Sequence, residues 1–150
     1  MDRPLLIASD HGGFELKEKL KGVLDGMGVA YRDLGVASTD PVDYPDQARK
    51  VAEGVSRGEA ERGLLVCGSG QGMAMAANRF RGVRAALAAD EETARLSREH
   101  NDANVLALGG RLTDPAKAER ILKVWLETPF AGGRHAVRVA KIDLGGSELM

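Results

Sequence analysis

The stretch Leu64-Leu65-Val66-Cys67-Gly68-Ser69-Gly70-Gln71-Gly72 joins a short apolar run directly to a loop with a glycine at every second position. A continuous apolar run of this length predicts a β-strand that is buried on both faces of a sheet. Glycines at alternate positions let the backbone turn tightly and come close to a ligand. Residues 73–79 then predict a helix. The stretch therefore predicts one unit of a fold in which strands and helices alternate.

Two similar apolar runs precede this one and two follow it, and helical segments separate them. The predicted strands cover residues 5–8, 29–34, 64–67, 83–88 and 104–108. The predicted helices cover residues 14–27, 45–57, 73–79, 91–100, 112–126 and 134–144. Gly28 is expected to end the first helix, and Asp90 and Asp114 to cap two others. The alternation predicts a doubly wound, Rossmann-like α/β fold with a sheet of five parallel strands and helices on both faces.

The last predicted helix, residues 134–144, follows the fifth strand and belongs to no strand–helix–strand unit. Two arrangements fit this position: the helix packs on its own sheet, or it is exchanged onto a partner subunit. Arg134 and Arg138 are four residues apart and therefore share one face of the helix. Two neighbouring guanidinium groups suit a phosphate, and the alternative is a solvated basic surface.

Length and composition narrow the class of protein. The chain has 150 residues, which predicts a single domain over residues 1–150. Lys and Arg number 21 against 22 Asp and Glu, so no basic excess indicates a nucleic-acid partner. One cysteine excludes an intramolecular disulfide and a cysteine-based zinc cluster. The N-terminus has no signal-peptide pattern and no apolar stretch approaches 18 residues, so we expect a cytoplasmic protein without a membrane partner.

The glycine loop at 68–72 is the strongest local indication of a functional site. Successive backbone N–H groups turned inward can bind an anion, and the start of the following helix adds its positive end. The ligand would carry a phosphate, a carboxylate or an enolate oxygen. The alternative is an ordinary turn between a strand and a helix.

Polar side chains also follow other predicted strands, where ligands bind in sheets of this kind. They are Asp10 and His11 after the first strand, Cys67 and Ser69 after the third, His100 and Asn101 after the helix that follows the fourth, and Arg111 after the fifth. We expect these side chains to share one cleft. Amide dipoles of the glycine loop would favour a thiolate at Cys67, and the alternative is an inert buried cysteine. For His100 the alternative is contact with the negative end of its own helix.

A dinucleotide-binding oxidoreductase domain is one alternative. Its G-x-G-x-x-G fingerprint needs a third glycine where this chain has Met73, although Asp90 lies about 20 residues further on, as the fingerprint requires. Cys67 and Ser69 beside the loop favour chemistry on the ligand over binding of a cofactor.

Seven stretches resemble the type B ribose-5-phosphate isomerases, a family that also includes the galactose-6-phosphate isomerase subunits. They are residues 9–17, 43–45, 67–72, 76–79, 98–105, 109–111 and 133–135, and they run in order along nearly the whole chain. The resemblance implies an isomerase of the pentose phosphate pathway that interconverts D-ribose 5-phosphate and D-ribulose 5-phosphate without a cofactor. The chain is most similar to the branch of the family that keeps a cysteine at the position of Cys67. Relatives without this cysteine use a glutamate where this chain has Met73.

The resemblance also implies a role for each site residue. Cys67 would be the base, and His100 would open the furanose ring. The enediolate oxygens would be held by the loop that contains Gly68, Gly70, Gln71 and Gly72. Ser69, which is Thr in many relatives, would hydrogen-bond the sugar. Sugar hydroxyls would be contacted by Asp10, Tyr44 and Asn101. The phosphate would be bound by His11, Arg111, Arg134 and Arg138.

The family likeness further implies a homodimer, or a tetramer, with active sites shared between subunits and the last helix reaching across to the partner. Three other functions remain as alternatives. They are an isomerase of a six-carbon sugar phosphate such as galactose or allose 6-phosphate, the nucleotide-binding oxidoreductase, and a non-catalytic sugar-phosphate-binding protein. Keeping Cys67, Ser69 and His100 together argues against the last of these.

Overall fold

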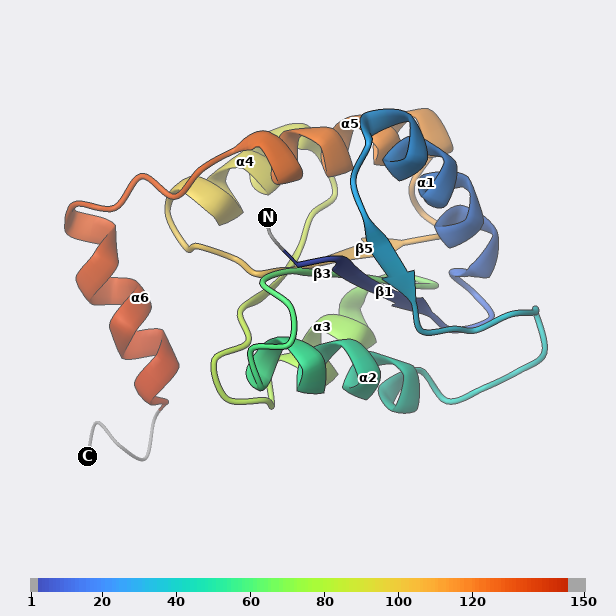
Figure 1. Ribbon diagram of the computed structural model, residues 1–150, viewed down its shortest axis with the longest axis horizontal. Helices are drawn as coiled ribbons and strands as arrows, with labels where there is room; N and C mark the ends of the chain where they lie inside the picture. The colour runs from blue at the N-terminus through green and yellow to red at the C-terminus, as the bar shows by residue number, and fades with distance from the viewer. Residues whose placement is uncertain (1–2, 146–150) are drawn as a thin grey trace.

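Five parallel strands form a sheet through the middle of the protein (Figure 1). The structure is a computed structural model and describes residues 3–145. The strands are β1 (Leu5–Ser9), β2 (Tyr31–Asp33), β3 (Gly63–Cys67), β4 (Ala85–Leu87) and β5 (Val105–Gly109), in the spatial order β2-β1-β3-β5-β4. Every residue of β1, β3 and β5 is buried, as continuous apolar runs predict. The predicted fold class is confirmed.

Helices cover both faces of this sheet (Figure 1). On one face lie α1 (Phe14–Met27), α4 (Glu91–Glu99) and α5 (Pro115–Glu127), and on the other lie α2 (Tyr44–Ser56) and α3 (Gln71–Ala77). Successive residues of a strand point to opposite faces. Leu5 and Ile7 therefore enter the core under α1 and α5 around Trp125, whereas Leu6 and Ala8 enter the core under α2 and α3.

The two edge strands are shorter than predicted, at three residues each instead of six. An edge strand pairs on one side only, so its ends depend on other partners. At β4 these are side-chain amides: the backbone N of Arg84 donates to Oδ1 of Asn104 at 2.8 Å, and that of Ala85 donates to Oδ1 of Asn78 at 2.8 Å.

The predicted helix ends are largely confirmed. Gly28 ends α1 in the left-handed conformation, at φ 70°. Asp90 caps α4, because its Oδ1 accepts a hydrogen bond from the backbone N of Thr93 at 2.7 Å. Asp114 occupies the N-cap position of α5, but its side chain makes no capping hydrogen bond. The helix after the glycine loop starts at Gln71, two residues earlier than expected.

The helix α6 (Arg134–Leu144) stands apart from the two layers, at the far end of the molecule from the segment that links β2 to α2 (Figure 1). Val139 is the single buried residue of α6, and Val137, Ile142 and Leu144 are exposed. The helix therefore covers neither face of its own sheet, and its reach to a partner subunit stays a prediction.

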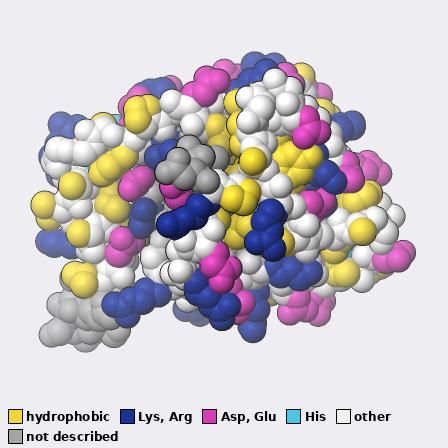
Figure 2. Space-filling model, in the orientation of Figure 1, with side chains coloured by type: hydrophobic (Ala, Val, Ile, Leu, Met, Phe, Trp, Pro, Cys, Tyr) yellow, Lys and Arg dark blue, Asp and Glu magenta, His cyan; other side chains and the backbone are white. Residues whose placement is uncertain are grey.

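The surface carries charges of both signs. On the face shown in Figure 2, Lys and Arg side chains are interspersed with Asp and Glu. Within residues 3–145, every helix is too short or too polar to cross a membrane.

Candidate active site

A cavity of about 460 Å³ opens at the carboxyl ends of the central strands. Its lining consists of Asp10, Tyr44, Cys67, Gly68, Ser69, Gly72, Arg111 and Leu112. All of these except Leu112 are residues that the sequence predicted for the site. The segments after β1, β3 and β5 meet here because parallel strands end at the same edge of a sheet.

Cys67 is the last residue of β3 and is only 4% exposed. Its carbonyl oxygen accepts a hydrogen bond from the backbone N of Gly110 at 2.7 Å, and that of Gly68 accepts one from Arg111 at 3.0 Å. These two bonds join the start of the glycine loop to the end of β5. The thiol therefore sits on a backbone that is held by the segment directly after β5.

The glycine loop needs glycine at two positions for different reasons. Gly70 has φ 82°, and a Cβ there would lie 2.9 Å from the carbonyl carbon of Leu108. A Cβ on Gly72 would lie 2.3 Å from a carbon of the Tyr44 ring, so this ring rests directly against the backbone. The hydroxyl of Ser69 accepts a weak hydrogen bond from the backbone N of Gln71 at 3.3 Å. Since α3 has only seven residues, an anion in this cavity would depend on the loop amides for its backbone contacts.

Asp10 and His11 shape the turn after β1. The buried Asp10 carboxylate accepts a hydrogen bond from the backbone N of Gly13 at 3.0 Å, which fits the expected start of α1. Nδ1 of His11 accepts one from the backbone N of Val42 at 3.1 Å. In a neutral imidazole Nε2 then carries the proton and is the free donor. His11 lies at this edge of the sheet without lining the cavity.

Arg111 extends over the backbone of two glycines. A Cβ added to Gly12 would lie 3.3 Å from its Cζ, and one added to Gly68 would lie 3.4 Å from its Nη1. The guanidinium group is thus held beside the glycine loop, where it can bind an anion with paired hydrogen bonds.

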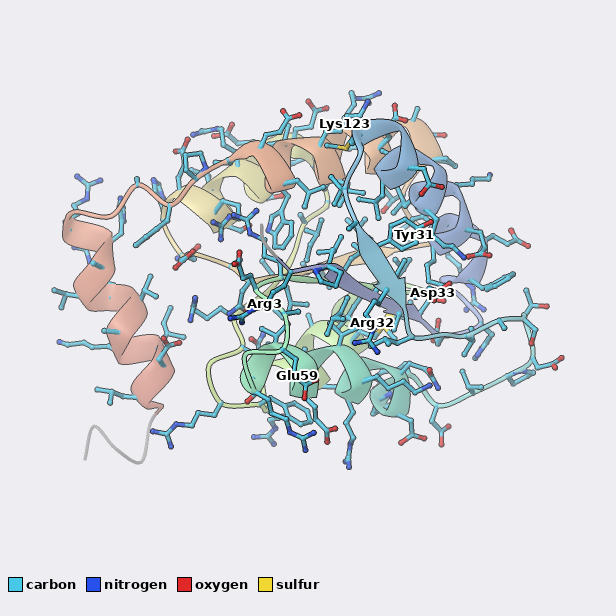
Figure 3. The ribbon with its side chains drawn as sticks, in the orientation of Figure 1. Arg3, Tyr31, Arg32, Asp33, Glu59 and Lys123 are labelled. Atoms are coloured by element: carbon cyan, nitrogen blue, oxygen red, sulfur yellow. The ribbon has the colours of Figure 1, made fainter. Side chains whose placement is uncertain are left out.

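One buried lysine was not predicted from the sequence. Lys17 is fully buried, and its Nζ donates to both carboxylate oxygens of Asp33 at 2.7 and 2.8 Å and to the carbonyl of Val36 at 2.9 Å. Tyr31 and Asp33 lie on the α1 side of β2, whereas Arg32 lies on the α2 side (Figure 3). The signal was a lysine on the apolar face of an amphipathic helix.

The charge of Asp33 is stabilised by this contact. Partial burial alone would raise the pKa of its carboxyl group, but hydrogen bonds from Lys17 and Lys21 outweigh burial and lower that pKa. Lys17 therefore joins α1, the end of β2 and the segment that leads toward Tyr44.

Four predicted site residues lie away from this cavity, at the amino-end edge of the sheet: His100, Asn101, Arg134 and Arg138. The expectation of one cleft within the chain is therefore wrong for His100 and Asn101, whereas Arg134 and Arg138 were expected to reach a partner subunit. The helix α4 runs back against the direction of the strands, so its last residues reach the edge where β5 begins. Accordingly, the carbonyl of Asn104 there accepts a hydrogen bond from Gly63 at the start of β3.

His100, Arg134 and Arg138 form a basic group with His135. The ring of His100 stacks on that of His135, with centroids 4.3 Å apart. Partial burial lowers the pKa of His135, and the neighbouring His100, Arg134 and Arg138 lower it further. A second cavity of about 550 Å³ lies beside this group and is lined by Asn101, Arg84 and Asp143 among others. It is the larger of the two, but Cys67 and the glycine loop are not there, so the smaller cavity is the candidate active site.

Asp90, which the dinucleotide-binding alternative requires, has a structural explanation. Besides the bond from the Thr93 backbone, it accepts one from the Thr93 hydroxyl at 2.8 Å. The backbone bond and the hydroxyl bond lower the pKa of its carboxyl group. Asp90 is thus a helix cap.

Comparison with known proteins gives a consistent result. A family described as Ribose/Galactose Isomerase matches residues 5–142. Ribose-5-phosphate isomerase B of Escherichia coli is 41% identical over 140 residues, which cover 93% of this chain and 94% of that protein.

Solved structures agree. A ribose 5-phosphate isomerase from Thermotoga maritima superposes with a TM-score of 0.93 at 50% identity and covers 97% of this chain and 100% of that one. Ribose-5-phosphate isomerase B from Mycoplasma genitalium, with bound ribulose-5-phosphate, superposes with a TM-score of 0.91 at 41% identity, over 95% of both chains. With this fold and these relatives, the protein is an isomerase. The chain belongs to the ribose/galactose isomerase family.

Proposed function

We propose that the protein interconverts D-ribose 5-phosphate and D-ribulose 5-phosphate in the cytoplasm, without a metal or organic cofactor. The observation that carries this proposal is the cavity, which brings Cys67, Ser69 and Arg111 together in the fold of type B ribose 5-phosphate isomerases. An aldose–ketose isomerisation needs a base, donors to a developing enediolate and a group that binds the phosphate. The cavity residues are of these types.

In the proposed reaction the Cys67 thiolate removes the proton from C2 of the open-chain aldose. The electron pair forms the C1–C2 enediolate, the hydroxyl proton passes from O2 to O1, and the thiol returns its proton to C1. Amides of the glycine loop and the hydroxyl of Ser69 donate to the enediolate oxygens as their charge develops. Because Cys67 is almost fully buried, little water competes for the proton.

Binding groups surround this centre. Asp10 and Tyr44 contact the sugar hydroxyls, and Arg111 with the Nε2–H of His11 binds the phosphate. Holding the phosphate keeps C1 and C2 beside the thiolate. His100 opens the ring, and Asn101 binds a hydroxyl, from the second subunit.

We further propose a homodimer, alone or within a tetramer, in which each cavity is completed by the partner's end of α4 and α6. The support is geometric: the basic group at the amino-end edge lies away from the cavity of its own chain. A twofold axis lets each subunit place this group at the other's cavity. Exposed Val137, Ile142 and Leu144 give α6 apolar surface for such a contact.

The test is a comparison of initial rates on D-ribose 5-phosphate, D-allose 6-phosphate and D-galactose 6-phosphate at equal enzyme concentration. We expect the five-carbon substrate to have a kcat/KM at least about tenfold higher, since a pocket fitted to one chain length loses about 1–3 kcal/mol per mismatched group. A higher value for either six-carbon substrate would establish the alternative specificity.

A further inference from the structure

The helix α6 is joined to the rest of its chain by polar and ring contacts near its two ends, and Val139 between them is its single buried residue. Just before it, the backbone N of Ala131 donates to the carbonyl of Glu99 at 3.1 Å, and at its start the His135 ring stacks on His100. At its last turn both carboxylate oxygens of Asp143 accept from Nη1 of Arg84, at 2.9 and 3.0 Å. The cavity of about 550 Å³ lies beside its second half. The direction of α6 within the chain therefore depends on few contacts.

Arg84 is itself held firmly by the body of the protein. Its backbone N donates to Oδ1 of Asn104 at 2.8 Å, and its carbonyl accepts from the backbone N of Asn104 at 2.9 Å. Its Nε donates to the carbonyl of Asp102 at 2.9 Å, and its side chain is only 15% exposed. With so few degrees of freedom left, the planar guanidinium group presents a fixed donor to α6.

The same guanidinium group also contacts the turn that carries His100 and Asn101. Its Nη2 lies 3.4 Å from Oδ2 of Asp102, whose Oδ1 accepts from the buried Arg98 at 2.9 Å. Asp102 needs such support because its φ is 47°, in the left-handed region. One arginine thus ties the end of α6 to the turn after α4.

We propose that Arg84 and Asp143 are positioning residues, whose ion pair fixes the direction of α6 and so sets where Arg134 and Arg138 stand relative to His100. The inference rests on the proposed function, in which these groups together complete a partner's cavity. Gly132 and Gly133, both at positive φ, precede α6 and give it a point about which to pivot. The helix is about 16 Å long at 1.5 Å per residue, so releasing its far end displaces Arg138 and its phosphate contact.

The test uses Asp143→Asn, which keeps the shape of the side chain and removes its charge. We expect the KM for ribose 5-phosphate and the inhibition constant of inorganic phosphate each to rise about three- to tenfold, because charge-assisted hydrogen bonds depend on geometry. The kcat should stay within about twofold, because Cys67 and its loop are untouched. Arg84→Lys should raise both constants in the same way. The double variant should show no larger increase than the more impaired of the two single variants, as expected of one shared interaction.

The matched control is Glu91→Gln. It neutralises the carboxylate of another Arg–carboxylate pair, that with Arg120 at 2.9 Å, far from α6. Amide hydrogen exchange over 134–144 should be faster in Asp143→Asn and unchanged in Glu91→Gln. If KM, phosphate inhibition and this exchange all stay unchanged in Asp143→Asn, the positioning role is wrong.

Arg138→Ala separates this inference from the proposed function. If Arg138→Ala weakens phosphate inhibition and Asp143→Asn does not, only the positioning role fails. If Arg138→Ala leaves phosphate inhibition unchanged, the proposed phosphate contact fails, and hydrogen exchange still decides whether Arg84 and Asp143 hold the helix.

Discussion

Cys67 is both the last residue of a buried strand and part of the cavity lining. The strand is fully buried, and Gly68, Ser69 and Gly72 of the glycine loop that follows line the cavity with Cys67. A buried strand end fixes the position of the thiol, and the loop leaves room for a ligand above it. The same residue therefore belongs to the core and to the candidate active site.

Replacing the base should abolish the reaction without removing the fold. We expect Cys67→Ala to lower kcat by at least about 10²–10⁴, the usual contribution of a positioned base. The inhibition constant of inorganic phosphate and the thermal midpoint should change little, because the substitution removes only a single sulfur atom. Alkylation of the thiol should inactivate the unaltered protein, and bound substrate should protect it. Full activity in Cys67→Ala would mean that another group is the base.

Gly72 offers a second test at this scale. In Gly72→Ala the new Cβ would meet the Tyr44 ring, so the ring must leave its place beside the loop. We expect kcat/KM for ribose 5-phosphate to fall about tenfold, the loss of one hydrogen-bond contact to the sugar. Gly22→Ala is the control, since a Cβ there meets nothing within 4 Å and alanine favours a helix. Equal kinetics in the two variants would contradict a contact between Tyr44 and the sugar.

At the scale of elements, Lys17 joins α1 to the end of β2. A buried ammonium group is tolerated here because Asp33 and a carbonyl oxygen accept hydrogen bonds from it. The segment beyond Asp33 then runs to Val42, which donates to His11, and on to Tyr44 at the start of α2. The ion pair thus anchors the start of the segment that leads to Tyr44 in the cavity lining.

Stability should depend on pH through this pair. The folded state lowers the pKa of Asp33, so its contribution is present above the unfolded value of about 4 and is lost as pH falls through the folded value. We expect Asp33→Asn to lower the free energy of unfolding by about 1–3 kcal/mol at pH 7, because a buried ammonium loses its partner. The difference from the unaltered protein should shrink as pH falls below about 4. Urea denaturation across this range measures it, and a difference independent of pH would contradict the assignment.

Lys17→Met is the companion variant. It replaces the buried ammonium with an apolar chain of similar length and leaves Asp33 partly open to water. We expect a smaller loss of stability than in Asp33→Asn, since no charge is then left buried without a partner. A larger loss would mean that the hydrogen bond to Val36 matters more than the ion pair.

At the scale of the whole molecule, the two halves of the proposed site lie at opposite edges of one sheet. Cys67 faces the carboxyl-end cavity, whereas Arg134 and Arg138 stand on α6 beyond the amino-end edge (Figure 1). A helix that follows a strand must run back across the sheet before the next parallel strand begins. The end of α4 and everything after α5 therefore come out at the amino-end edge.

Mixing two inactive variants should restore activity if the site is shared. Cys67→Ala lacks the base, and Arg134→Ala with Arg138→Ala lacks the phosphate contact. A heterodimer of the two has one intact cavity and one that lacks both. Random exchange at equal concentrations should therefore give about a quarter of the activity of the unaltered protein. No recovery, with exchange shown independently by mass, would place the base and the two arginines in one chain.

The sequence alone was enough to predict the five strands, their alternation with helices and most of the cavity lining. Fully buried strands require continuous apolar runs, and parallel strands bring their carboxyl ends together, so Asp10, Cys67, Ser69 and Arg111 could be assigned to one site from their positions. The errors concerned the ends of individual strands. The two edge strands were predicted too long. At β4 an apolar run does not reveal that Asn78 and Asn104 take the backbone bonds at the start of the strand.

Only the tertiary structure decided which predicted residues face the cavity within one chain. His100 and Asn101 follow a helix, and the edge they reach depends on the direction in which that helix crosses the sheet. The partner of Lys17 and the contact of Arg84 with Asp143 could likewise not be predicted, since each contact joins segments at least 16 residues apart. Periodicity reports which side of an element is buried, whereas the partner of a buried charge depends on how the elements pack.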